Sequence, residues 1–108
     1  MKVEKVKQSR WNKDSWRNTE FGSVFSDHMF VVKYKDGQWQ KGEIKPYGTI
    51  NILPSLHSLH YGQSIFEGMK AYKGPKDETF LFRPDQNAKR FNKSAARMCM
   101  PEIPEDLF

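Results

Sequence analysis

The stretch HMFVVKYKDGQWQKGEI, residues 28–44, decides the class of the fold because it has the pattern of a β-hairpin. β-Branched and aromatic residues dominate 28–34, and Asp36-Gly37 is a dipeptide that favours the tight turn between two strands. We therefore expect a strand over 28–34, a turn, and a return strand over 38–44. A further short strand is expected over 49–53, where Pro54 ends it.

Beyond this hairpin the sequence predicts a loop over 55–62 and a short turn of helix near 63–66. Two more strands are expected over 69–72 and 79–82, and the sequence between them, Gly74-Pro75-Lys76-Asp77, is rich in turn-forming residues. These two strands should form a second hairpin.

A helix is the clearest element, and it begins at Pro84. Proline suits the first helical position, and Asp85 places a negative charge in the first turn, where the helix dipole favours it. Apolar residues recur at spacings of three and four and predict one buried face; they are Ala88, Phe91, Ala95 and Met98.

Three arginines spaced seven apart, Arg83, Arg90 and Arg97, project from a different side of this helix. They predict a basic ridge that is turned away from the core of the domain. A solvated helix face is the simplest interpretation of such a ridge.

The composition indicates one small basic domain with a thin core. The chain has 108 residues and a net charge of +5, and hydrophobic residues make up 37% of it, against about 45–50% apolar residues in typical globular domains. We expect the core to be completed against another domain or subunit. The 14% of aromatic residues argues against disorder.

Several classes of protein and site are disfavoured. A single cysteine, Cys99, leaves no internal disulfide and no cysteine-rich zinc site. Because the sequence has neither an apolar run of about 20 residues nor an apolar signal-peptide core, we expect a cytoplasmic protein without a membrane partner. His57 and His60 lack a nearby third ligand, so we expect no metal.

Residues 1–20 have a different character from the remainder and predict a separate basic arm. They carry six basic and three acidic side chains. Trp11 and Trp16 are spaced for neither a helix nor a strand, and we expect this arm to dock on the surface through their indole rings. The net positive charge of the chain is compatible with binding nucleic acid, anionic lipid or a phosphorylated small molecule.

One loop brackets aromatic residues between glycines. Tyr61 and Phe66 lie close to Gly62 and Gly68, and glycine permits strained turns and close approach to a ligand. Both rings are therefore expected on a loop, with ordinary core packing as the alternative. Glu67 is also close enough in sequence to Lys70 for a local ion pair, which contributes little when exposed.

The run SLHYGQSIFEGMKAY, residues 58–72, resembles the branched-chain amino acid aminotransferases. Further motifs follow in the order that this family has, and the resemblance extends from about residue 21 to residue 101. These motifs are Phe21-Gly22, Phe25-Ser26-Asp27-His28-Met29, Leu81-Phe82-Arg83-Pro84, Asn87, Arg90 and Arg97-Met98-Cys99-Met100-Pro101.

The resemblance implies a pyridoxal 5′-phosphate enzyme of fold type IV. Members of this family have a small N-terminal α+β domain, mainly antiparallel sheet packed with helices, and hold the cofactor at its junction with a larger domain. They act as homodimers or as larger assemblies of dimers, and they transfer the amino group of leucine, isoleucine or valine to 2-oxoglutarate. Residues 21–108 would be an incomplete small domain of this kind.

Individual residues match positions of known role in the family. Arg90 matches the arginine that holds the cofactor phosphate, while Phe21, Tyr61 and Phe66 match rings that line the pocket for the branched side chain. Lys70 does not match the family's Schiff-base lysine, which lies far beyond position 108. The resemblance therefore implies no catalytic residue in this chain, and we expect residues 1–108 to be an inactive fragment by themselves.

Two alternatives remain open at this point. Other fold-type IV enzymes, such as D-amino acid aminotransferases and aminodeoxychorismate lyases, share the architecture, although the run from Phe66 to Tyr72 favours the branched-chain enzymes. A nucleic-acid-binding module could instead use the basic arm and the arginine ridge, but charge combined with aromatic residues is an unspecific signal. We accordingly expect no nucleic acid among the partners.

Overall fold

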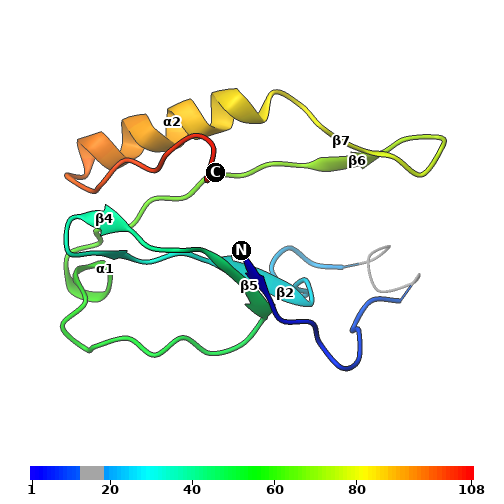
Figure 1. Ribbon diagram of the computed structural model, residues 1–108, viewed down its shortest axis with the longest axis horizontal. Helices are drawn as coiled ribbons and strands as arrows, with labels where there is room; N and C mark the ends of the chain where they lie inside the picture. The colour runs from blue at the N-terminus through cyan, green and yellow to red at the C-terminus, as the bar shows by residue number, and fades with distance from the viewer. Residues whose placement is uncertain (13–18) are drawn as a thin grey trace. The chain divides into compact units, whose positions relative to one another are not determined.

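The computed structural model describes residues 1–12 and 19–108, and these form two compact units, Met1–Asn51 and Ile52–Phe108. The regular elements among the described residues are small, mostly antiparallel sheets and helices, which agrees with the α+β class (Figure 1). Within the same residues, no helix combines the length and the apolar composition that crossing a membrane requires.

A three-stranded sheet organises the first unit. Its central strand β5 (Glu43–Pro46) pairs antiparallel with β2 (His28–Val31), so that Phe30 lies opposite Ile44. The short strand β1 (Lys2–Val3) adds to the other edge of β5 in a parallel direction (Figure 1). The start of the chain is therefore a part of this sheet.

The predicted hairpin turn is confirmed between β3 (Tyr34–Lys35) and β4 (Gln38–Trp39). Asp36 and Gly37 both have positive φ, 53° and 78°, as the two central residues of a type I′ turn require. The rings of Tyr34 and Trp39 pack edge to face, with their centroids 5.2 Å apart.

Neither strand of this hairpin is continuous, although we expected unbroken strands over 28–34 and 38–44. Two residues, 32–33, separate β2 from β3, whereas three residues, 40–42, separate β4 from β5. An unequal count on paired strands is the property of a β-bulge, which interrupts the ladder. Gly42 fits this position because a Cβ there would collide with the ring of Phe30.

Polar contacts hold the described part of the N-terminal arm to the first unit. The Asp27 carboxylate accepts hydrogen bonds from the Ser9 hydroxyl at 2.6 Å and from the Arg10 N–H at 2.8 Å. The hydrogen bond from Ser9, more than any other contact, lowers the pKa of Asp27. Trp11 is exposed, and Trp16 lies outside the described residues.

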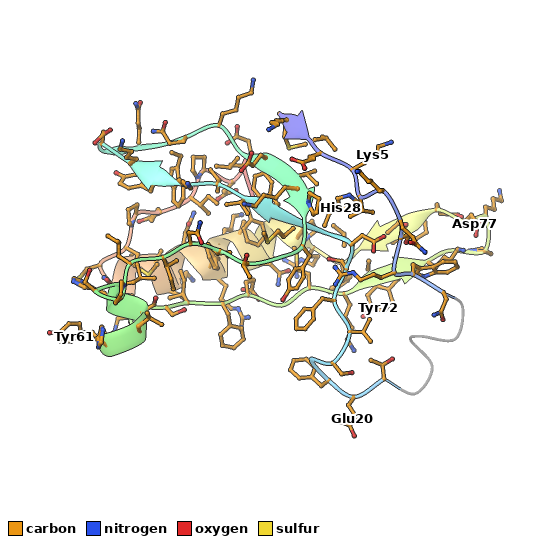
Figure 2. All side chains as sticks on the ribbon, turned by 90° about the horizontal axis from the view of Figure 1, so that it is seen from below. Lys5, Glu20, His28, Tyr61, Tyr72 and Asp77 are labelled. Carbon is orange, nitrogen blue, oxygen red and sulfur yellow. The ribbon has the colours of Figure 1, made fainter. Side chains whose placement is uncertain are left out.

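The second unit contains the second predicted hairpin, which the structure confirms. β6 (Ala71–Lys73) pairs antiparallel with β7 (Thr79–Leu81), and the turn between them closes through a hydrogen bond of 2.8 Å from Gly74 N–H to the Glu78 carbonyl. Asp77 lies at the tip with φ 65° (Figure 2).

Two local predictions are wrong. Residues 49–53 form no strand, because no strand in the described part of the chain pairs with their backbone and their isoleucine side chains are exposed. The short helix α1 covers His57–His60 rather than 63–66. The imidazole of His60 lies 2.6 Å from the Pro54 carbonyl oxygen and closes this helical turn, whereas 63–66 has no regular secondary structure.

The long helix α2 (Pro84–Arg97) confirms the strongest prediction. Arg83 precedes it in a left-handed conformation, and Pro84 occupies its first turn. Of the apolar side chains that the structure describes, only Ala88 and Ala95 are fully buried, at 2% and 1% exposure, so the core is thin as expected. All three residues of the predicted arginine ridge, Arg83, Arg90 and Arg97, are exposed.

Candidate functional site

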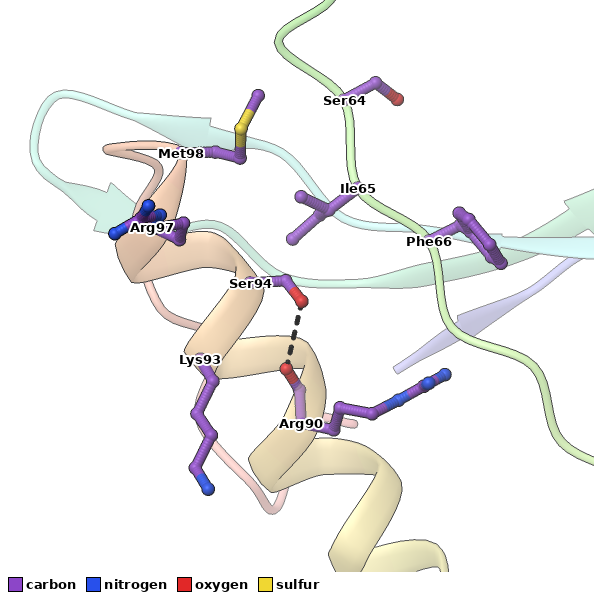
Figure 3. A pocket seen from close by; sticks show the side chains of 8 residues that line it. All are labelled: Ser64, Ile65, Phe66, Arg90, Lys93, Ser94, Arg97 and Met98. Atoms are coloured by element: carbon purple, nitrogen blue, oxygen red, sulfur yellow. Dashed lines mark hydrogen bonds between the residues drawn. The ribbon is translucent and has the colours of Figure 1, made fainter.

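An open cavity of about 570 Å³ lies in the second unit, beside α2. One side of the cavity is helix, and the other is the irregular segment that follows α1 (Figure 3). The residues lining it are Ser64, Ile65, Phe66, Arg90, Lys93, Ser94, Arg97 and Met98.

The helical side of this cavity is cationic. Arg90, Lys93 and Arg97 are three and four residues apart, so they share one broad face of α2. No carboxylate is among the lining residues. The positive charge and the guanidinium donors make this side suitable for an anion.

The opposite side of the cavity is largely apolar. Ile65 and Phe66 extend from the irregular segment, and Met98 closes the end of the cavity at the C-terminus of α2 (Figure 3). Phe66 is 87% exposed and therefore contributes no core packing within the chain. A cationic wall facing an apolar wall suits a ligand that combines an anionic group with an apolar portion.

An ion pair joins the two sides. The Glu67 carboxylate accepts a hydrogen bond of 2.6 Å from Arg90 Nε–H and a second bond from Arg90 Nη2. Arg90 remains 66% exposed at its side chain, whereas Glu67 is only 4% exposed. This contact corrects the sequence-based interpretation, which paired Glu67 with Lys70.

Further donors surround the Glu67 carboxylate. Its Oε1 accepts from the N–H of Gly68 at 2.8 Å and from Nδ2 of Asn87 at 3.1 Å. Hydrogen bonding to Arg90 is the main reason that the pKa of Glu67 falls to about 2, and the bonds from Gly68 and Asn87 lower it further. Glu67 is therefore ionised throughout the physiological pH range.

Side-chain amides fix the irregular segment along α2. Gln63 donates through Nε2 to the Met98 carbonyl at 2.9 Å, at the C-terminus of the helix. Asn87 donates through Nδ2 to the Gly68 carbonyl at 3.2 Å, near the N-terminus of the helix. The segment is thus attached at both ends of the cavity, which positions Phe66 and Glu67 between the two attachments.

The structure brings together only two of the four residues that the sequence singled out. Arg90 and Phe66 line the same cavity. Tyr61 directly follows α1, is 81% exposed, packs edge to face on His57 at 5.5 Å, and is not among the residues lining the cavity (Figure 2). Phe21 belongs to the first unit and is exposed there.

Sequence reasoning missed Lys93 and the role of Glu67. Lys93 lies three residues after Arg90 on the helix face, so the spacing of the basic residues could have revealed it. The signal for Glu67 was a charged residue in an otherwise apolar run. Neither His57 nor His60 belongs to a cluster of three metal-ligating side chains among the described residues.

Comparison with known proteins shows close relatives. The chain is 48% identical over 88 residues to branched-chain-amino-acid transaminase 1 of Bacillus subtilis, covering 81% of this chain and 25% of that protein. It is 47% identical over 108 residues to a probable branched-chain-amino-acid aminotransferase of Staphylococcus epidermidis (95% and 30%). A branched-chain-amino-acid aminotransferase of Helicobacter pylori is 41% identical over 93 residues (86% and 27%).

The chain thus spans between a quarter and three tenths of the length of these relatives. No family model matches it.

Proposed function

We propose, since this chain is homologous to part of the branched-chain aminotransferases, that it serves in the transfer of an amino group from leucine, isoleucine or valine to 2-oxoglutarate. The similarity of 40–48% identity over most of the chain carries this proposal. We place residues 21–108 in the small domain of a fold-type IV enzyme, preceded by the arm 1–20. The active form is a cytoplasmic homodimer.

Pyridoxal 5′-phosphate fits the cavity beside α2 in charge and in composition. Arg90 would hold the phosphate, because its side chain lines the cavity and is 66% exposed, and Lys93 and Arg97 add positive charge to the same wall. The space of about 570 Å³ is within the usual range of small-molecule sites. The cofactor, when bound, supplies the electron sink for amino-group transfer.

The exposed rings would form walls for the substrate side chain. Phe66 lines the cavity next to the cationic wall. The family resemblance alone assigns Tyr61 and Phe21 to the same role, and the side chains of both are exposed. Covering a Val- or Leu-sized side chain with such rings contributes about 1.5–3 kcal/mol, while charged substrates would gain nothing from them. We assign no reacting group to residues 1–108, so the chain contributes binding and positioning.

A chimera tests this function. Residues 1–108 would replace the matching segment of the Bacillus subtilis transaminase, and glutamate formation from L-leucine and 2-oxoglutarate would be measured in the presence of pyridoxal 5′-phosphate. We expect turnover by the chimera and none by residues 1–108 alone. A folded chimera that accepts D-alanine but not L-leucine would refute the assignment to branched-chain substrates, and turnover by the isolated chain would refute its role in positioning only.

A further inference from the structure

We propose that Glu67 is a positioning residue: its carboxylate holds one edge of the Arg90 guanidinium and presents the other edge to an anion in the cavity. This inference rests on the proposed function, which assigns Arg90 to a phosphate group. It adds the requirement that Arg90 be held in one orientation before the anion binds.

The pattern of hydrogen bonds defines which edge remains available. A guanidinium carries five N–H groups in one plane, and Glu67 occupies the Nε–H and one hydrogen of Nη2. Both hydrogens of Nη1 and the second hydrogen of Nη2 are left, and they form an edge that can bind two phosphate oxygens at once. The Arg90 side chain is 66% exposed and runs from α2 toward the segment that carries Phe66 (Figure 3).

The carboxylate itself is immobilised, as a positioning group must be. Glu67 is 4% exposed, and its Oε1 also accepts hydrogen bonds from Gly68 N–H and Asn87 Nδ2. Arg90 therefore binds a fixed acceptor rather than a mobile one. An arginine that is ordered in advance loses less side-chain freedom when its anion binds, which increases affinity.

The charge of Glu67 acts against this benefit. A carboxylate in contact with Arg90 repels an incoming anion, and Lys93 and Arg97 are the two lining residues that offset it. Positioning and simple electrostatics therefore predict opposite results when Glu67 is neutralised. This opposition makes the inference testable by a single substitution.

Glu67→Gln provides the test, with pyridoxine 5′-phosphate as the probe because it has no aldehyde to react with surface lysines. We expect the dissociation constant of pyridoxine 5′-phosphate to increase about fivefold to tenfold in this variant, because binding must then order the Arg90 side chain, although the site becomes one charge more positive. Pyridoxine, which has no phosphate, measures binding that does not depend on Arg90, and its affinity should not change. Unchanged or tighter binding of pyridoxine 5′-phosphate to the variant would overturn the inference.

Arg90→Ala separates this inference from the proposed function. If Arg90→Ala leaves the affinity unchanged, the phosphate is not held by Arg90 and the proposed role of that residue fails. If Arg90→Ala weakens binding and Glu67→Gln does not, only the positioning role fails. The double variant should bind no more weakly than Arg90→Ala alone, because Glu67 acts through Arg90 and, without Arg90, its charge only repels the anion.

A direct readout covers the case in which the glutamine variant unfolds. Glu67→Asp keeps the charge but is one methylene too short to hold the same edge, so it should weaken binding to a similar extent. In nitrogen-15 NMR spectra, the Arg90 Nε–H should exchange with water more rapidly in this variant than in the wild type. A wild-type exchange rate together with wild-type affinity would refute positioning.

Discussion

Each unit contains an arginine–carboxylate pair, and the two pairs differ in how much of the arginine guanidinium they leave available to a ligand. In the first unit Asp27 accepts from the Arg10 backbone and faces its guanidinium, and in the second unit Glu67 faces Arg90. Each carboxylate accepts one backbone N–H and one hydrogen bond from a neutral side chain. Each thereby joins segments far apart in the sequence, and the pKa of each is lowered by its hydrogen bonds.

The arginines of the two pairs are used differently. Arg10 donates through Nη2 to the Ser26 carbonyl at 2.6 Å, has its Nε 3.7 Å from the Asp27 carboxylate, and lies over the Tyr47 ring at 5.4 Å. Three partners thus occupy its guanidinium. Arg90 has one carboxylate on one edge of its guanidinium, and its side chain, which is 66% exposed, lines the cavity. The unused edge of the guanidinium, rather than the ion pair, therefore identifies an arginine that can bind a ligand.

Replacing each arginine with alanine is the most severe test of this comparison and should have the largest effect. Arg90→Ala is expected to raise the dissociation constant of pyridoxine 5′-phosphate about tenfold to hundredfold, because hydrogen bonds to a charged group are lost. Arg10→Ala should leave it within about twofold. Isothermal titration calorimetry measures both, and an equal loss in the two variants would contradict the distinction.

Asp27→Asn tests whether the pair in the first unit holds the N-terminal arm and takes no part in anion binding. The amide keeps one acceptor oxygen where the carboxylate had two, and it loses the charge that faces Arg10. We expect the Arg10 backbone amide to exchange its hydrogen about threefold to tenfold faster, with no change in anion affinity. Hydrogen exchange followed by NMR measures this.

Asp36→Asn is the matched control for that exchange experiment. Asp36 contacts Lys35 at 3.8 Å, and its side chain is 78% exposed. Exchange at Arg10 should be unaltered in this variant. Faster exchange at Arg10 in both variants would mean that net charge, and not the carboxylate of Asp27, holds the arm.

The local sequence was sufficient to predict those elements whose structure depends on interactions between neighbouring residues. The Asp36-Gly37 turn and the buried face of α2 could be predicted because turn geometry and helical period depend on neighbouring residues. The strand expected over 49–53 was wrong because a strand exists only when another strand pairs with it. The bulge near Gly42 could not be predicted for the same reason, since it depends on how two strands are aligned.

The candidate site was predictable only in part. Helical spacing placed Arg90 on an exposed face, and a family resemblance assigned it to phosphate. The pairing with Glu67 joins residues 23 positions apart and depends on how the segment 63–68 docks along α2. Lys70 was the nearer cation in sequence, but Glu67 pairs with the residue that the docking of this segment brings to it.

A third ion pair tests how much a pair with two exposed side chains stabilises the chain. Lys73 Nζ lies 2.7 Å from Asp77 Oδ1 in the β6–β7 hairpin, yet the two side chains are 73% and 84% exposed. Water screens such a pair, so Lys73→Gln should change the free energy of unfolding by no more than about 0.5 kcal/mol. Lys73 is the residue to replace because Asp77 has φ 65°, and a substitution there would also alter the backbone. Urea unfolding measures this change in the free energy of unfolding. A loss above about 1 kcal/mol would show that the short distance between the charged atoms, and not burial of the carboxylate, decides which of these ion pairs stabilises the chain.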